Sequence, residues 1–285
     1  MTRPDLRLDE LKQLAERDDL GAFVARATRL HPSDLADVLA ELDEPRRARV
    51  VAELPTDVAS RALAEMEAGE HPEELLLAVG PDYAADLVEQ LPSDDAADII
   101  ADLPAEEREA VLAELADRRD VDRLLRYSED TAGGLMTTGV VAVREDATLA
   151  EALEEIRRQS EEHDEPYQVF VVDGERRLKG VLPIARLVVG APGRRVGEVM
   201  EPPPVTVRPE QDQEEVARAM ARYNVAAVPV LDEARRLLGR VTFDDVIDVV
   251  EAEATEDLLK FGGVDPAEDL AAAWTDAVRQ RLPWL

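Results

Sequence analysis

The feature that most constrains this fold is a twelve-residue repeat in the first part of the chain. Leu91-Pro-Ser-Asp is followed twelve residues later by Leu103-Pro-Ala-Glu, and Leu54-Pro-Thr-Asp opens another copy. Each copy predicts a turn with Pro in the first helical positions, an acid near the helix N-terminus and then two apolar turns. Such short helices are not stable alone. Neighbouring copies must therefore stack into a superhelix with one shared core, at residues 5–127.

After Tyr127 the sequence pattern changes from helical to mixed. Short β-branched runs occupy residues 140–143, 168–172 and 227–230, and helical patterns at 149–158 and 214–223 separate them. This alternation predicts an α/β fold. The whole chain is therefore expected to combine an all-α part with an α/β part.

A second repeat, with a period near 60, lies in this later region. Residues 171–182 (VVDGERRLKGVL) align with 230–241 (VLDEARRLLGRV), which places Asp173 on Asp232 and Gly180 on Gly239. The Pro- and Gly-rich link at 191–204 cannot be helical. We expect two copies of a β-α-β-β-α unit that bury their sheets against each other.

Charge and cysteine content exclude several classes of function. The chain has no Cys, which excludes a disulfide framework, a thiolate zinc site and a cysteine nucleophile. Its 64 acidic and 33 basic residues give a formal net charge of −31. A chain this acidic has no basic surface for nucleic acid and favours cations as partners.

No motif of an enzyme active site is present. The three His residues (His31, His71, His163) are far apart, and none has the spacing of a metal motif such as HExxH. No Gly-x-Ser-x-Gly, Walker-type or GxGxxG loop occurs. We therefore expect that the chain is not an enzyme.

Residues 241–259 carry seven carboxylates and neither Lys nor Arg. On a helix, Asp245 and Asp248 share a face, and like charges at this spacing oppose helix formation unless something neutralises them. A solvated acidic face is one interpretation. The other is a divalent-cation site, because Mg²⁺ takes oxygen ligands and commonly uses only one or two carboxylates while keeping several waters.

The later region resembles a tandem pair of CBS domains. The helix-to-Met opening, the strand ending in Val143-Arg144, the Asp-rich hairpin and the closing Gly239-x-x-Thr242-x-x-Asp245 carry this resemblance. With the helical repeat, three further strings resemble the cytosolic part of MgtE-type magnesium channels: YSEDTAGGLMT (127–137), DQEEVAR (212–218) and DVVEAEATED (248–257). The resemblance implies a helical superhelix at 5–127, CBS domains at 128–195 and 196–250, and a connecting helix at 251–285.

The same resemblance implies positions for Mg²⁺, with Mn²⁺ and Ca²⁺ as alternative ions. The implied ligands are Asp94, the Gly134 carbonyl, Asp212, Glu214, Asp245, Asp248, Glu253, Glu256 and Asp257. Two positions depart from the family pattern, because Arg61 stands where a Glu is expected and Asn224 where an Asp is expected. Arg61 cannot ligate Mg²⁺, whereas Asn224 retains a carbonyl oxygen.

CBS pairs often bind adenine nucleotides through the Thr-x-x-Asp motif. The second copy keeps this motif as Thr242 and Asp245, but the first copy has Pro183 and Arg186 in its place. At most one ATP site per chain is implied.

In the resembling family a membrane domain follows directly, and this sequence stops at Arg281-Leu-Pro-Trp-Leu285. Residues 269–285 place Trp274, Val278 and Leu282 at helical spacing, which is typical of an ordinary amphipathic helix or of one lying along the membrane interface. The resemblance implies that this element is a plug beside the pore. No stretch approaches a membrane span. We expect a soluble piece of a longer protein at the cytoplasmic face of the membrane, dimeric through its CBS pairs.

Three hypotheses follow for function. The first is a magnesium-sensing region whose acidic faces bind Mg²⁺ and stabilise a compact, pore-closed state. The second is an adenine-nucleotide-sensing CBS module, and the third is an acidic interaction scaffold without specific metal sites.

Overall fold

The computed structural model describes residues 3–66, 68–160 and 168–261, and for residues 3–7, 68, 251–252 and 256–261 it describes the backbone alone. The chain divides into two units. The helical unit comprises residues 1–129 and 136–139, and the strand unit comprises residues 130–135 and 140–285. The chain therefore passes between the two units three times.

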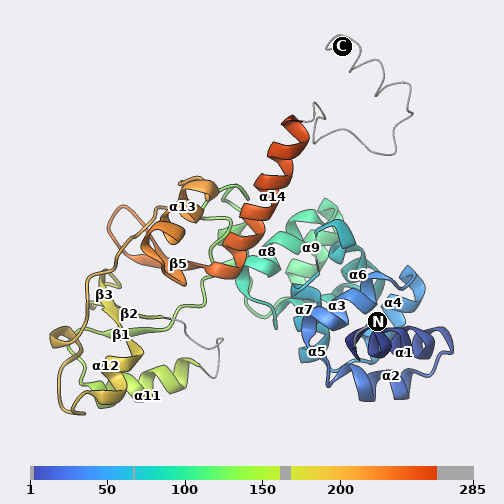
Figure 1. The fold of residues 1–285 in the computed structure, drawn as a ribbon, viewed down its shortest axis with the longest axis horizontal. Coiled ribbons are helices and arrows are strands. Elements are labelled where there is room, and N and C mark those ends of the chain that lie inside the picture. Colours follow the sequence, from blue (N-terminus) through green and yellow to red (C-terminus); the bar gives the residue numbers. More distant parts are fainter. Residues whose placement is uncertain (1–2, 67, 161–167, 262–285) are drawn as a thin grey trace, which may run out of the picture. The chain divides into compact units, whose positions relative to one another are not determined.

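The helical unit is built from short helices, as the repeat predicts (Figure 1). They are α1 (Arg3–Glu16), α2 (Leu20–Ala27), α3 (Pro32–Ala40), α4 (Glu44–Glu53), α5 (Thr56–Ala64), η1 (Ala68–Glu70), α6 (Pro72–Val79), α7 (Pro81–Val88), α8 (Ser93–Asp102), α9 (Ala105–Glu114) and α10 (Arg119–Leu124). In the Leu-Pro copies the prolines Pro55, Pro92 and Pro104 stand at the N-cap, just before the first helical position where we expected them. The proline ring fixes φ, and with the extended ψ of the N-cap residue it sets the direction in which the next helix starts.

One hydrophobic core runs through this unit. It extends from Leu11 to Val121, and Phe23, Leu87 and Ile100 are fully buried within it. The small side chains of each helix let successive helices approach closely around these larger residues. The prediction of a shared core is confirmed.

The strand unit contains two small sheets. The first comprises β1 (Ala142–Arg144), β2 (Val169–Val172) and β3 (Leu178–Leu182), with β1 parallel and β3 antiparallel to β2. The second pairs β4 (Ala227–Leu231) with β5 (Leu237–Thr242) in antiparallel fashion. The helices are α11 (Leu149–Gln159), α12 (Ile184–Val189), the 3₁₀ turn η2 (Val196–Glu198), α13 (Gln213–Tyr223) and α14 (Phe243–Phe261).

The second copy lacks the first strand that the repeat predicts. Val207 forms only an isolated parallel bridge to Val230, with its N–H donating to Pro229 O at 3.1 Å. Three consecutive prolines at 202–204 and Pro209 flank this position. Proline has no N–H to donate to a ladder, so pairing cannot extend along this segment.

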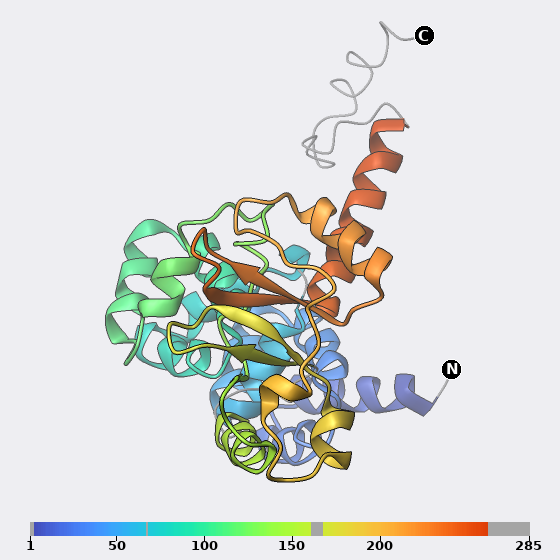
Figure 2. The same ribbon diagram turned by 90° about the vertical axis from the view of Figure 1, so that its left-hand side faces the viewer.

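The two sheets lie next to each other (Figure 2), and apolar side chains of both form one core. Phe170, Val172 and Val181 of the first sheet share a core with Leu231 and Leu237 of the second. The expectation from the repeat is confirmed at this core.

The turns of the two hairpins are joined by reciprocal hydrogen bonds. Leu178 N donates to Arg235 O at 3.0 Å, and Leu237 N donates to Arg176 O at 2.9 Å. Arg176 and Arg235 both adopt positive φ, 60° and 63°. The β2–β3 turn and the β4–β5 turn therefore have the same conformation and make matching hydrogen bonds to each other.

Candidate functional site

The turn between β5 and α14 holds the Thr242-x-x-Asp245 motif. The Asp245 carboxylate accepts hydrogen bonds from the Thr242 N–H at 3.1 Å and from the Thr242 hydroxyl at 2.5 Å. An acid at the third helical position that accepts from the N-cap backbone is half of a capping box. The Thr and the Asp of the motif therefore bind each other and fix the start of α14.

Three acids, Asp244, Asp245 and Asp248, lie in the first two turns of α14. Burial raises the pKa of the Asp245 carboxyl, and the negative charges of Asp244 and Asp248 raise it as well, against the opposing hydrogen bonds from Thr242. The charged form of Asp245 is thus disfavoured in the folded protein. A cation beside these carboxylates would relieve the repulsion.

Carboxylates on α10 and α11 have basic neighbours instead. Glu154 pairs with Arg157 at 2.5 Å and Asp122 with Arg118 at 2.8 Å. In α14 the first basic residue is Lys260, near the far end of the helix. The acidic start of α14 therefore lacks the i,i+3 and i,i+4 basic partners that α10 and α11 have, and in this it is like α3, α6, α7 and α8, which contain no Lys or Arg.

The first turn of α13 brings two more predicted ligands near α14. Asp212 is the N-cap of α13 and accepts from Glu214 N at 2.9 Å, whereas the Glu214 carboxylate pairs with Arg218 at 3.0 Å. Gln213, between them, donates its side-chain N–H to Glu253 of α14 at 3.2 Å. Glu253 thus contacts the residue between Asp212 and Glu214, and Glu214 is already paired to a base.

Asp94 lies in the first turn of α8 and is only 6% exposed. Beside it, Ser93 Oγ accepts from the Thr138 N–H at 2.8 Å, which ties residues 136–139 to the helical unit. Gly134 is buried and belongs to the strand unit. A metal bridge between Asp94 and Gly134 would join the two units, and it stays a prediction.

The remaining predicted ligands are Glu256 and Asp257, whose side chains lie outside the described residues. Residues 269–285, the predicted plug element, also lie outside them. Within the described ranges, no group of three His, Asp or Glu side chains converges in a way that could hold a metal ion. The metal ligand set as a whole stays a prediction.

The two departures from the family pattern have local structural roles. Arg61 pairs with Asp57, one helical turn earlier, at 2.9 Å. Asn224 ends α13 in the left-handed conformation, with φ 50°. Asn adopts this conformation at helix C-termini more readily than most residues. The helix C-terminus therefore explains an Asn at this position without metal binding.

Sequence reasoning missed two basic features of the strand unit. Arg240 is 5% exposed, and its Nε and Nη1 have no hydrogen-bond partner among the described residues. The repeat predicts an aliphatic side chain there, because Val181 is its counterpart in the first copy. The second feature is a cavity beside β1 and α11 with arginines in its lining. In the sequence, the adjacent arginines of the two hairpins, Arg176-Arg177 and Arg235-Arg236, are the feature that pointed to basic groups in this unit.

No helix among the described residues is long and apolar enough to cross a bilayer.

Family models match most of the chain. The model of the MgtE intracellular N domain matches residues 30–130, and the CBS domain model matches residues 132–189 and 196–252. Among curated proteins, the magnesium transporter MgtE of Thermus thermophilus is 53% identical over 148 residues, 52% of this chain and 33% of the relative. MgtE of Bacillus subtilis is 37% identical over 172 residues, 60% of this chain and 38% of the relative. The chain spans about a third of the length of these relatives.

Two solved structures share the architecture. The soluble part of a magnesium transporter superposes with a TM-score of 0.81 at 28% identity, covering 88% of this chain and all of that one. The cytosolic domain of the Mg²⁺ channel MgtE, solved in complex with ATP, gives a TM-score of 0.78 at 39% identity, covering 85% of this chain and 99% of that one. Since this likeness spans both units and almost all of that domain, the chain belongs to the MgtE family and comprises its intracellular N domain followed by a pair of CBS domains.

Proposed function

We propose that this chain is the magnesium-sensing regulatory region of a magnesium channel or transporter, at the cytoplasmic face of the membrane. Its partner would be the membrane domain of the same transporter. The observation that carries the proposal is the acidic start of α14, where Asp244, Asp245 and Asp248 share two turns without a basic residue. Mg²⁺ suits such a surface because it binds through one or two carboxylates and keeps several waters.

The mechanism is a shift between two populations. At low Mg²⁺, repulsion among acidic faces favours separated domains, and at high Mg²⁺ bound ions favour a compact state that closes the pore. The size of the shift is set by the difference in Mg²⁺ affinity between the two states. Several weak sites that act together would make the response steep.

Mg²⁺ should raise the unfolding temperature beyond the effect of NaCl at the same ionic strength. An ion that binds only the folded state contributes roughly 2.7 kcal/mol at a hundred times its dissociation constant.

The double variant Asp245→Asn, Asp248→Asn should require more Mg²⁺ for the same stabilisation. It should also be more stable than the wild type in chelator. The folded-state pKa of Asp245 is raised above its usual value, so stability falls as pH rises from the unfolded-state pKa through the folded-state pKa, and the penalty is complete above the folded-state pKa.

Differential scanning calorimetry in chelator, in Mg²⁺ and in matched NaCl measures both effects. The matched control is Asp117→Asn, Asp120→Asn, which removes the same charge from acids paired with Arg119 and Arg123. An unchanged Mg²⁺ dependence in the α14 variant, or an equal change in the control, would contradict the assignment.

The proposed assembly is a homodimer through the CBS pairs. The helices that close the two copies each expose an apolar face: Ile184 and Val188 on α12, and Phe243, Ile247 and Val250 on α14. These residues follow the i, i+4, i+7 spacing of a single helix face. A second copy of the chain would cover both faces at once.

Charges placed on this face should prevent dimerisation. The variant Val188→Glu, Ile247→Glu is expected to elute as a monomer in size-exclusion chromatography with light scattering, where the wild type has twice the chain mass. Leu77→Glu is the control, because Leu77 is an exposed apolar residue of the helical unit, at 41%. A dimeric double variant would rule out this interface.

Adenine-nucleotide sensing is the second candidate function, because the related cytosolic domain was solved with ATP. The second copy keeps Thr242 and Asp245, but they bind each other here. In the first copy, Arg186 replaces the Asp and lies 3.5 Å from Glu201. Calorimetric titrations with Mg²⁺ alone and with ATP alone separate the two candidates.

A further inference from the structure

The two CBS copies have equivalent helices, α11 and α13, but only α13 starts beside an acidic helix. Each follows an N-cap residue, Thr148 in the first copy and Asp212 in the second. α13 packs on α14, and the Gln213 side chain donates to Glu253 of α14 at 3.2 Å. The helix of the first copy that corresponds to α14 is α12, whose sequence IARLVV contains no acid. The start of α13 therefore contacts an acidic helix, whereas the corresponding helix of the first copy carries no acid.

One ion pair at the start of α13 involves a predicted magnesium ligand. The Glu214 carboxylate accepts from Arg218 Nη2 at 3.0 Å, and Arg218 Nε donates to the Glu214 carbonyl oxygen at 3.0 Å. Two hydrogen bonds to one residue thus hold the guanidinium at the first turn of α13. Among the described residues, Arg218 is the one base that pairs with an acid of this turn.

The Glu214–Arg218 pair is specific to the second copy. Alignment of the two N-cap residues places Ala150 of α11 at the position of Glu214, and Glu154 at the position of Arg218. The first copy therefore has neither this acid nor this base. The pair occurs in the copy that also carries the acidic helix α14, which indicates that the two features belong together.

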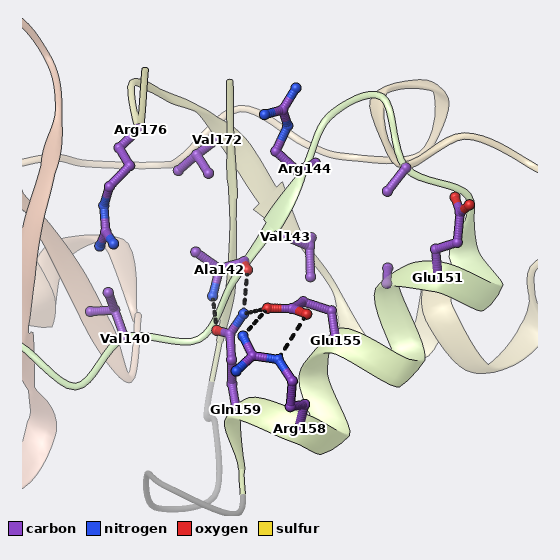
Figure 3. A pocket seen from close by; sticks show the side chains of 12 residues that line it. Val140, Ala142, Val143, Arg144, Glu151, Glu155, Arg158, Gln159, Val172 and Arg176 are labelled. Carbon is purple, nitrogen blue, oxygen red and sulfur yellow. Dashed lines mark hydrogen bonds and ion pairs between the residues drawn. The ribbon is translucent and has the colours of Figure 1, made fainter. Parts of the chain in front are cut away.

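The Glu214 carboxylate is open to exchange of its partner, unlike an acid of α11. Glu155 accepts from Arg158 at 2.6 Å and from Gln159 at 2.5 Å, and Figure 3 shows both donors beside it. Glu214 has a single basic partner, and the side chains of Glu214 and Arg218 are 48% and 69% exposed. Exposed pairs of this kind contribute little to stability. A dissolved cation can therefore reach the Glu214 carboxylate and replace the guanidinium.

We propose that Arg218 is a tethered cation that competes with Mg²⁺ for the Glu214 carboxylate and so sets the Mg²⁺ concentration at which the chain responds. This inference rests on the proposed magnesium sensing, with Glu214 as one of its ligands. The donors fit the ion, because Asp212 and Glu214 offer carboxylate oxygens, and Mg²⁺ commonly uses one or two carboxylates and keeps several waters. An ion at Glu214 meets the positive charge of Arg218, so Mg²⁺ must displace the guanidinium in order to bind.

The same competition discriminates against monovalent cations. Arg218 is held beside Glu214 by the chain, so its effective concentration does not depend on the medium. K⁺ carries half the charge of Mg²⁺ and attracts a carboxylate more weakly, which makes it less able to displace the guanidinium. The pair therefore keeps this carboxylate closed to monovalent salt and leaves it accessible to Mg²⁺.

Thermal melting of the 285-residue chain, titrated with Mg²⁺ from chelator, tests the inference. Arg218→Gln should lower the Mg²⁺ concentration of half-maximal stabilisation about threefold or more, because the competitor is gone. In chelator this variant should melt at or slightly below the wild type, since an i,i+4 pair is lost. Arg218→Lys keeps the charge and should remain near the wild-type Mg²⁺ midpoint.

Two further variants serve as controls. Arg157→Gln is the matched control, because Arg157 pairs with Glu154 at 2.5 Å on the equivalent helix of the first copy. It removes the same charge from the same kind of pair and should leave the Mg²⁺ midpoint unchanged. In a Glu214→Gln background, Arg218→Gln should shift the midpoint much less, because both residues act through one carboxylate.

A lower midpoint in Arg218→Gln, but not in Arg218→Lys or Arg157→Gln, supports the inference. An unchanged midpoint in Arg218→Gln, in a protein whose wild type responds to Mg²⁺, overturns the role of Arg218 and leaves the magnesium proposal standing. An equal shift in Arg157→Gln also overturns it, since net charge alone would then account for the effect. A wild type that responds to Mg²⁺ no more than to matched NaCl overturns both proposals.

Discussion

Replacing Phe170 with alanine should lower the free energy of unfolding of the strand unit by about 3–5 kcal/mol. Phe170 is fully buried, and it fills the core that joins the two CBS sheets together with Leu231 and Leu237. Truncation removes the largest side chain of this core and leaves a cavity that two hairpins, held together at their turns, cannot close. The loss should appear in chemical denaturation as a lower midpoint.

The control for this prediction is Tyr223→Ala, an aromatic truncation in the same unit at a side chain that is 46% exposed. It should cost much less, because most of its surface meets water in the folded protein. If Phe170→Ala costs no more than Tyr223→Ala, the packing of the two sheets around Phe170 is wrong.

Gly180→Ala should destabilise the first CBS sheet by about 1–3 kcal/mol or more. A Cβ at this position would lie 2.6 Å from the Glu201 carbonyl oxygen and 3.1 Å from Met200 Sδ. Val181, next to Gly180, exchanges backbone hydrogen bonds with Glu201 at 2.8 and 2.9 Å, so the obstructing carbonyl belongs to paired backbone. The backbone of β3 or of residues 200–201 would have to shift to relieve this clash, because a hydrogen-bonded backbone carbonyl cannot rotate away as a flexible side chain can.

Two other glycines serve as controls in the same thermal-melting experiment. A Cβ at Gly193 would meet nothing within 4 Å, and one at Gly174 would meet only the end of the flexible Arg144 side chain, at 3.3 Å. Both alanine variants should therefore melt close to the wild type. A melting temperature for Gly180→Ala in the same range would disprove the close approach of residues 200–201 to β3.

The repeats made most of the fold predictable from the sequence. The Leu-Pro spacing located α8 and α9, and the alignment of residues 171–182 with 230–241 located both hairpins. The absence of a strand at Val207 was not predicted. The apolar pattern of the repeat indicates a strand there, but the neighbouring prolines lack the N–H groups that a strand needs for pairing. Family membership confirms that the chain is not an enzyme.

The candidate site was predictable only in part. Spacing on one helix places Asp245 and Asp248 together, since that is a local property. It cannot reveal that Glu253 meets Gln213, because that contact depends on how α13 packs on α14. The arginine-lined cavity could not be predicted for the same reason: Arg144 ends β1 and Arg176 lies in the β2–β3 turn, so they line one cavity only after the sheet forms.

The length of α14 means that a small rotation of the second CBS copy would displace the far end of this helix by a larger distance. The helix starts at the Thr242–Asp245 turn and runs without interruption for 19 residues, about 28 Å at 1.5 Å per residue. Because the carboxylate of Asp245 holds the first turn of the helix to Thr242 at the end of β5, we expect the helix axis to follow the sheet. A rotation of the sheet by about 10° would sweep the far end of the helix through about 5 Å. Small rearrangements around the acidic turn are therefore magnified into displacements larger than the width of a water molecule at Phe261.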